Sequence, residues 1–358
     1  MQKKISLAII FGGKSAEHGV SVVSAQNIVK ALNKEKYNIT FIGIDKKGEW
    51  NYFSEKDFFS INEVKESNNN LKVYPSTKNN KFYLSIGNNE TLIEVVFPVL
   101  HGTYGEDGTF QGFCKLFNVA FVGPDVLSSA ICMDKDVSKR LLRDSNIPIA
   151  NFLVFNNQER DMISFSEIKK ALGLPFFIKP ANLGSSVGIS KIKTEKDFKV
   201  ALEKAFLYDK KIVVEENIDG REIEISVLGN EKPTASLPGE IIANHDFYSY
   251  EAKYIDKNGS SLIAPVNLPQ DLIEEIQSLA IKSFKTLSCE GMARVDFFLT
   301  KEQKVIVNEI NTIPGFTSIS MYPKLFEVSG LKYSDLIDKL IIFAIEKHKK
   351  DTLLKTIY

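Results

Sequence analysis

Apolar runs recur along the chain at intervals that leave room for helices between them. Five runs rich in Ile, Val and Phe have the length of buried strands: ISLAIIF at 5–11, ITFIGI at 39–44, EVVFPVL at 94–100, LPFFIKP at 174–180 and KIVVEENI at 211–218. Segments with apolar positions at helical spacing separate several of them, such as SVVSAQNIVKAL at 21–32 and KDVSKRLLRDSN at 135–146. This alternation of strand and helix predicts an α/β fold.

The second half of the chain continues with a helix, two short strands and a final helix. LIEEIQSLAIKSFKTL at 272–287 is amphipathic, and two strand-like runs follow it, ARVDFFL at 293–299 and KVIVNEIN at 304–311. YSDLIDKLIIFAIEKH at 333–348 predicts the last helix. By contrast, residues 50–90 are rich in Asn, Lys and Ser and have weak patterning, so we expect surface strands and loops there.

Turn-forming dipeptides indicate where the chain divides. Gly-Pro at 123–124 and Asp-Gly at 219–220 are the plausible boundaries. They predict three units, which are residues 1–123, 124–218 and 219–358.

Composition narrows the class of partner. The chain of 358 residues carries 45 Lys plus Arg and 45 Asp plus Glu, so no net charge directs it toward nucleic acid or membrane, and a small-molecule partner is expected. The three cysteines are far apart and lack zinc-site spacing. No stretch reaches the roughly 18 apolar residues of a membrane span, and the first apolar run is too short for a signal peptide. We therefore expect a cytoplasmic protein.

The first candidate motif, FGGKSAEHGVS at 11–21, follows the first predicted strand. A phosphate-binding P-loop would need a glycine where Ala8 stands, and the glycines do not fit a dinucleotide fingerprint either. The motif is instead a tight turn that presents Glu17 at the carboxyl end of a strand, where ligands bind in open α/β sheets. LHGTYGEDGTFQG at 100–112 ends another strand with His101 and Glu106, and we expect Glu17 and His101 to face one pocket.

The strongest local signal is IKPANLGSSVGISKI at 178–192. Lys179 at a strand end is followed by a loop that contains Ser185 and Ser186 between two glycines. Such a loop can bring N–H and hydroxyl donors close to a phosphate, although a flexible hairpin loop is the commoner meaning of G-S-S-x-G by itself. Lys179 favours the phosphate interpretation.

A further acidic segment, EENIDGREIEISV at 215–227, carries two spaced carboxylates. Glu215 and Glu222 could accept hydrogen bonds from an adenine amino group and ribose hydroxyls, or they could form a solvated acidic edge. The segment alone leaves both interpretations open.

Polar side chains on the last two predicted strands form a candidate metal site. Arg294 and Asp296 are two residues apart and point to one face, and so do Glu309 and Asn311. If the strands are neighbours, two carboxylates and an amide oxygen gather beside a guanidinium, and these hard oxygens suit Mg²⁺. The alternative is a surface salt-bridge ladder, which does not explain the amide.

The loop TIPGFTSISMYP at 312–323 follows the second of these strands directly. It is dense in Gly, Pro, Ser and Thr, so its N–H groups and hydroxyls could hold a substrate carboxylate or an oxyanion. By itself a plain turn is the simpler interpretation.

Taken together, these segments resemble the D-alanine:D-alanine ligases, ATP-grasp enzymes of bacterial cell-wall synthesis. Eight motifs stand in the family order over nearly the whole chain: GGKSAEHGVS, HGTYGEDGT, MDK, IKPANLGSSVGISK, VEENIDGRE, FYSYEAKY, ARVDFF and NEINTIPGFTSIS. Only residues 50–90 match no motif. The resemblance implies a three-domain ATP-grasp fold: an N-terminal Rossmann-like substrate domain with a parallel sheet, a central subdomain, and a C-terminal subdomain with a lid loop and the metal site.

The resemblance also implies an activity. ATP phosphorylates one D-alanine, and the D-alanyl phosphate then reacts with a second D-alanine to give D-alanyl-D-alanine for peptidoglycan precursors. A ligase that takes D-lactate or D-serine second is the near alternative, which the FYSYEAKY segment disfavours. A silent nucleotide-binding regulator is the distant one. A homodimer is the family expectation.

Roles for individual residues follow from the matching positions. The ATP-binding residues implied by the resemblance are Lys135, Lys179, Ser186, Glu215, Glu216, Glu222 and Lys253, with Lys253 at the γ-phosphate. The implied ligands of two Mg²⁺ ions, with Mn²⁺ as an alternative metal, are Asp296, Glu309 and Asn311, and Glu309 bridges the ions.

Substrate contacts are implied in the same way. Glu17 takes the ammonium of the first D-alanine and joins Ser185 and Tyr254 in a hydrogen-bonded triad. The remaining implied contacts are Arg294 and the Gly315 N–H for the oxyanion, Ser320 and the Met321 backbone for the second carboxylate, and His101 as a neighbour of the substrates. The sequence identifies no base for the amine. One position departs from the family, since Gly19 stands where an acidic residue is usual.

Overall fold

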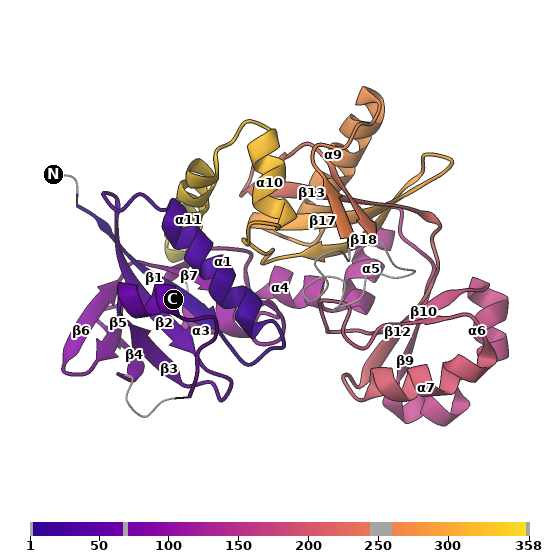
Figure 1. Ribbon diagram of the computed structural model, residues 1–358, viewed down its shortest axis with the longest axis horizontal. Coiled ribbons are helices and arrows are strands. Elements are labelled where there is room, and N and C mark those ends of the chain that lie inside the picture. Colours follow the sequence, from indigo (N-terminus) through magenta and orange to yellow (C-terminus); the bar gives the residue numbers. More distant parts are fainter. Residues whose placement is uncertain (1–2, 67–70, 244–259, 356–358) are drawn as a thin grey trace.

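The computed structural model describes residues 3–66, 71–243 and 260–355. These residues form four sheets, which helices separate and cover (Figure 1). The predicted α/β fold is confirmed. The predicted helices at 21–32, 135–146, 272–287 and 333–348 are also confirmed, with ends that differ by a few residues.

The first sheet is mostly parallel, as predicted for a Rossmann-like unit. Its strand order is β3-β2-β1-β7-β8, and only β3 runs antiparallel to its neighbour. The strands are β1 (Ile5–Gly12), β2 (Tyr37–Ile44), β3 (Trp50–Phe53), β7 (Val95–Val99) and β8 (Ala120–Phe121).

Both faces of this sheet are buried, which explains why β1 is apolar from Leu7 to Phe11. Leu7 and Ile9 point to the face covered by α1 (His18–Ala31) and α11 (Tyr333–Thr352). Ala8 and Ile10 point to the opposite face, toward α3 (Thr109–Leu116). The C-terminal helix α11 thus packs on the N-terminal sheet, beside α1 (Figure 1).

Within residues 50–66 and 71–90 the predicted strands are confirmed, and they form more regular structure than the weak patterning indicated. After the short helix α2 (Glu55–Ser60), the chain forms an antiparallel sheet of β4 (Val73–Lys78), β5 (Lys81–Ile86) and β6 (Asn89–Ile93). Alternate residues of β5, such as Phe82 and Leu84, are buried against the first sheet. Many polar residues surround this short alternation, so the strand pattern is weak in the sequence.

The second sheet is antiparallel, and among the described residues helices cover one of its faces. Its order is β11-β10-β12-β9, from β9 (Phe152–Asn156), β10 (Phe176–Pro180), β11 (Ser190–Ile192) and β12 (Lys211–Glu216). Two helices, α6 (Phe165–Leu172) and α7 (Glu195–Phe206), pack on the face that carries Ile178 and Val214. The segments that lead into this sheet are α4 (Val126–Met133), α5 (Lys135–Asp144) and the 3₁₀ helix η1 (Asn157–Met162).

The third sheet is also antiparallel, in the order β16-β15-β13-β17-β18, with β14 on the edge of β13. Its strands are β13 (Gly220–Gly229), β14 (Thr234–Ala235), β15 (Gly239–Ala243), β16 (Ser260–Ile263), β17 (Gly291–Thr300) and β18 (Val305–Asn311). The long helix α9 (Gln270–Thr286) packs on its apolar face, where Ile225 and Val295 lie. A loop then leads to α10 (Met321–Val328) and on to α11. The opposite face carries the charged residues described next.

Candidate active site

The second and third sheets face each other across a cleft with a cavity of about 260 Å³. Its wall contains most of the residues predicted to bind ATP, together with one predicted metal ligand and the serine loop: Lys135, Lys179, Ser185, Ser186, Glu215, Glu216, Glu222 and Glu309. Apolar side chains complete it, among them Phe177, Ile189, Ile218 and Phe298. Lys253 lies outside the described residues. The structure therefore brings the segments that carry these predicted residues together in one cleft.

Strand alternation places the charged residues of the second sheet on the cleft side. Phe177 pairs with Glu215 and Lys179 with Val213 across β10 and β12, so Lys179 and Glu215 are diagonal neighbours on one face. The Lys179 ammonium lies 3.1 Å from Oε1 of Glu215, and both residues are buried.

Helix α5 places two lysines against residues of the cleft. Its first residue, Lys135, donates from Nζ to the Leu183 carbonyl at 2.6 Å, and this Nζ lies 3.8 Å from Oε2 of Glu309. One turn later, Lys139 lies 3.0 Å from Oε2 of Glu215. Sequence reasoning missed Lys139, although its spacing of four from Lys135 in a predicted helix places both on one face.

Salt bridges fix the start of α5 against the sheet. The Asp134 side chain caps the helix by accepting from the N–H groups of Asp136 and Val137. Lys211 of β12 donates to Asp134 at 2.6 Å and to Asp136 at 3.2 Å. The position of Lys135 and Lys139 is thus set by the strand that also carries Glu215.

The predicted metal residues are neighbours across β17 and β18. Asp296 pairs with Glu309 and Arg294 pairs with Asn311, and the register shifts after Asp296. The Asn311 amide donates from Nδ2 to Asp296 at 2.9 Å. Within residues 3–66, 71–243 and 260–355, no three His, Cys, Asp or Glu side chains gather as a metal site by themselves. The predicted donors are two carboxylates and one amide.

Arg294 holds Asp296 and a carboxylate that the sequence prediction missed. Its guanidinium donates to both oxygens of Asp296, at 2.7 Å each, and its Nε lies 3.0 Å from Oε2 of Glu224. Glu224 of β13 stands directly opposite Asp296 in the register. Burial works against the charge of Arg294, but Asp296 and Glu224 outweigh it and hold the pKa of the guanidinium well above its ordinary value.

The loop after β1 meets the serine loop of the second sheet. The Ser185 hydroxyl donates to Oε1 of Glu17, and Gly102 lies so close that a Cβ there would be 2.8 Å from Oε2 of Glu17. Ser185 and Ser186 both adopt positive φ, +52° and +59°, as the tight loop requires. Two members of the predicted triad are therefore in contact, and Tyr254 lies outside the described residues.

His101 lies beneath this loop in a buried polar cluster. Its Nδ1 is 3.0 Å from the Ile313 carbonyl and 3.7 Å from the Glu106 carboxylate, and its Nε2 is 3.3 Å from Oγ of Ser24. Burial works to lower the pKa of His101, but Glu106 outweighs it, so the pKa lies above its ordinary value. Burial also raises the pKa of Glu106. His101 thus connects the loop after β7 to the loop after β18.

The predicted carboxylate loop docks on α1. The Phe316 N–H donates to Ser24 at 3.2 Å. Ser320 precedes α10 and accepts from the Thr317 N–H at 2.9 Å, and a Cβ on Gly315 would lie 2.7 Å from its Oγ. The Met321 side chain is buried, which leaves its backbone as the part able to meet a ligand. Gly315, Ser320 and Met321 are brought together, but they are not part of the wall of the cavity in the cleft.

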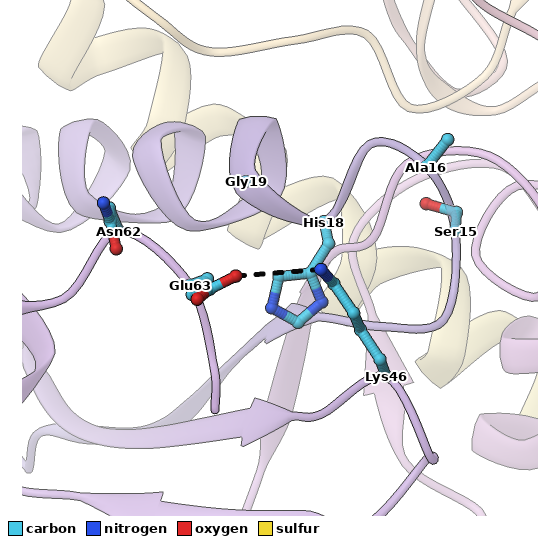
Figure 2. A pocket seen from close by; sticks show the side chains of 7 residues that line it. All are labelled: Ser15, Ala16, His18, Gly19, Lys46, Asn62 and Glu63. Atoms are coloured by element: carbon cyan, nitrogen blue, oxygen red, sulfur yellow. Dashed lines mark ion pairs between the residues drawn. The ribbon is translucent and has the colours of Figure 1, made fainter. Parts of the chain in front are cut away.

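A second cavity, of about 350 Å³, opens beside the Glu17 loop (Figure 2). Lys46 and Glu63 form an ion pair across it at 3.7 Å. His18 has a structural role here, because its Nδ1 bonds the Gly13 carbonyl at 2.6 Å and its Nε2 accepts from the Val64 N–H at 2.8 Å. None of the predicted site residues lines this second cavity, whereas eight of them line the cleft.

Gly19 lines this second cavity. A Cβ there would meet only the Asn62 carbonyl, at 3.8 Å, which is ordinary contact. Glycine at position 19, where the family usually has an acidic residue, therefore leaves space in the second cavity.

Comparison with known proteins agrees with the geometry. Residues 6–124 match the family model described as D-ala D-ala ligase N-terminus, and residues 141–342 match D-ala D-ala ligase C-terminus. The chain is 50% identical over 364 residues to a D-alanine--D-alanine ligase of Shouchella clausii, covering 99% of this chain and 98% of that one. It is 48% identical over 362 residues to D-alanine--D-alanine ligase A of Escherichia coli K12, covering 99% of each.

Solved structures are similar over almost the whole chain. The D-alanine-D-alanine ligase from Coxiella burnetii has a TM-score of 0.87 at 38% identity, covering 98% of this chain and 96% of that one. The VanG D-Ala:D-Ser ligase from Enterococcus faecalis has a TM-score of 0.84 at 36% identity, covering 96% and 100%. Along the described residues, no helix combines the length and apolar content that a membrane crossing needs.

Proposed function

The chain belongs to the D-alanine–D-alanine ligase family, and from this premise we propose how its cleft performs the family's reaction. The protein is an ATP-dependent ligase with the ATP-grasp fold, and it joins two D-alanines for peptidoglycan precursor synthesis. The observation that carries the assignment of roles is the wall of the cleft, where lysines from α5, β10 and β11 face carboxylates from two sheets.

We propose three functional units along the chain. Residues 1–123 supply the Glu17 and His101 loops, residues 124–218 supply the lysine face, and residues 219–358 supply the carboxylate face. The separate sheets of these segments support the division. Helix α11 would then tie the third unit to the first, since it packs on the first sheet.

ATP would lie between the second and third sheets. Lys135 and Lys179 would face its phosphates, with Ser186 and the backbone of the serine loop as further donors. Glu222 would receive the ribose, and Glu216, whose two oxygens already accept hydrogen bonds from Asn151, would line the adenine end of the cavity. Glu215 would act differently from the sequence expectation, because its two oxygens already lie against Lys139 and Lys179.

The residues present fit magnesium. Asp296, Glu309 and Asn311 offer hard oxygen donors at paired positions beside the phosphate face, which is the donor set that Mg²⁺ prefers. Two ions bound there would neutralise charge on the transferring phosphoryl group.

The chain's own residues would then position two reactions. Because a carboxylate is a poor electrophile, the γ-phosphoryl group first passes to the carboxylate of one D-alanine, whose ammonium Glu17 holds. The amine of the second D-alanine attacks this acyl phosphate, and Arg294 with the Gly315 N–H stabilises the oxyanion before phosphate leaves. Ser320 and the Met321 backbone would hold the second carboxylate, with His101 supporting the loop from beneath. Lys253 and Tyr254 keep the roles that the family resemblance implies.

The deciding experiment is phosphate release from ATP with and without D-alanine, with products identified by mass. We expect release that requires D-alanine and yields D-alanyl-D-alanine. Parallel reactions with D-lactate or D-serine as the second substrate test the near alternative. ATP hydrolysis indifferent to D-alanine would contradict the proposal.

Two further properties rest on the family alone. We propose a homodimer, which sedimentation would test, and a cytoplasmic location, where ATP is available to the reaction. Fractionation of the producing cell would test the second.

A further inference from the structure

Lys139 is a buried lysine that does not reach the cleft. Its side chain is 1% exposed, and it is not part of the cavity wall that Lys135, Lys179 and Glu215 line. Burial of an ammonium group is costly unless a counter-charge is close. The carboxylate of Glu215, 3.0 Å away, is that counter-charge. We therefore expect the positive charge of Lys139 to be needed beside Glu215.

Glu215 is shared between two lysines. Its Oε2 lies 3.0 Å from Lys139 of α5 and its Oε1 lies 3.1 Å from Lys179, so both lysines meet the carboxylate on the cleft-side face of the second sheet. Although burial works to raise the pKa of Glu215, the two lysines, Lys139 first, hold it below its ordinary value. Burial lowers the pKa of the Lys139 ammonium, although Glu215 works to raise it. Within this triad, two ammonium groups and one carboxylate leave one net positive charge. Without Lys139, the Lys179–Glu215 pair would carry none.

We propose that Lys139 is a positioning residue for the nucleotide: it neutralises Glu215 from α5, so that the charge of Lys179 remains available to the phosphates of ATP. The inference rests on the proposed function of the cleft. It makes Lys139 necessary for nucleotide affinity although it touches no substrate.

A purely structural role would look different. Lys139 and Arg143 both lie over the ring of Phe152, at 5.9 Å and 5.7 Å from its centroid. Arg143 is one turn further along α5 and gives a matched control, because it shares the aromatic contact. If packing against Phe152 were the function of Lys139, changes at the two positions should act alike.

The test is calorimetric titration of the full-length protein with Mg²⁺-ADP, without D-alanine. Lys139→Met removes the charge but keeps an unbranched apolar stem, and we expect ADP affinity to fall about tenfold or more, since an uncompensated Glu215 then competes for Lys179. Arg143→Met should stay within about twofold of the parent. In turnover assays the KM for ATP should rise more than kcat falls.

The double variant Lys139→Met/Glu215→Gln separates charge from packing. It removes the charges of residues 139 and 215 and leaves Lys179 without its carboxylate partner. The ADP affinity should therefore recover to within about threefold of the parent. The double variant also removes the uncompensated buried carboxylate, so it should fold even if Lys139→Met does not. A double variant that binds as weakly as Lys139→Met, or a Lys139→Met variant that binds like the parent, would overturn the inference. A parent protein that binds no ADP would instead overturn the proposed function.

Discussion

The first sheet and the two sheets of the cleft differ in how many of their faces are buried. In the first sheet both faces are buried, so β1 is apolar from Leu7 to Phe11 and its site residue, Glu17, comes from the loop after the strand. In the third sheet one face packs on α9 and the other faces the cleft, so β17 carries Arg294 and Asp296 on its strand face. Covering both faces of a sheet leaves only loop ends for chemistry, whereas covering one face leaves a rigid row of side chains.

This difference predicts different consequences of mutation. Charged side chains on strand faces are held in place by cross-strand pairing. Their loss should therefore weaken the binding of phosphates and metal strongly without disturbing the backbone. Loop residues should affect substrate affinity and the coupling of the two half-reactions more mildly.

The largest expected effect is on the strand face at β18. Glu309→Gln should reduce ligation at least about a hundredfold, because an amide replaces a carboxylate proposed to bridge two Mg²⁺ ions. The thermal midpoint should change little. Steady-state ligation and thermal unfolding check both statements. The exposed Glu302→Gln, in the turn before β18, is the matched control and should behave like the parent. Ligation of Glu309→Gln within tenfold of the parent would remove Glu309 from the metal site.

The next effect concerns the lysine face. Lys179→Ala should weaken Mg²⁺-ADP binding by about ten- to a hundredfold, since it removes a charge placed against the phosphates. Titration calorimetry measures it directly. Lys210→Ala, an exposed lysine before β12, should leave the affinity unchanged. Equal affinities of the Lys179 variant and the parent would move Lys179 out of the phosphate site.

The loop contact should give a smaller and different effect. Ser185→Ala removes the donor to Glu17, at a cost of about 1 to 3 kcal/mol for the carboxylate left with one partner fewer. The KM for D-alanine should rise about tenfold while ADP affinity stays close to the parent value, and more ATP should be hydrolysed per dipeptide. One assay that counts phosphate and product measures the coupling. A variant with altered ADP affinity and unaltered D-alanine KM would reverse the assignment of this contact.

The smallest effect is expected at Gly19. Gly19→Asp adds an acidic residue in the first turn of α1, where the side chain enters open space. Helix propensity and the helix dipole should raise the free energy of unfolding by about 0.5 to 1.5 kcal/mol. Ligation should stay within about twofold. Denaturant unfolding and steady-state kinetics measure the two quantities, and a large gain in ligation would show that the glycine impairs the Glu17 loop.

Local sequence determined the helices and strands and much of the candidate site. Helical spacing predicted α5, α9 and α11, and the two-residue spacing of Arg294 with Asp296 and of Glu309 with Asn311 placed each pair on one strand face. These features follow from the geometry of a single element, so they can be read without knowing what the element packs against.

Tertiary structure decided the partners. Lys139 could be placed on the same helix face as Lys135, but only the packing of α5 on β12 brings it to Glu215. Glu224 looks like any strand residue until β13 pairs with β17 and sets it beside Arg294. Likewise, α11 ends the chain yet covers the first sheet. Charge pairs and sheet coverings depend on contacts between residues far apart in the chain, and the energy of a buried charge depends on its neighbours in space.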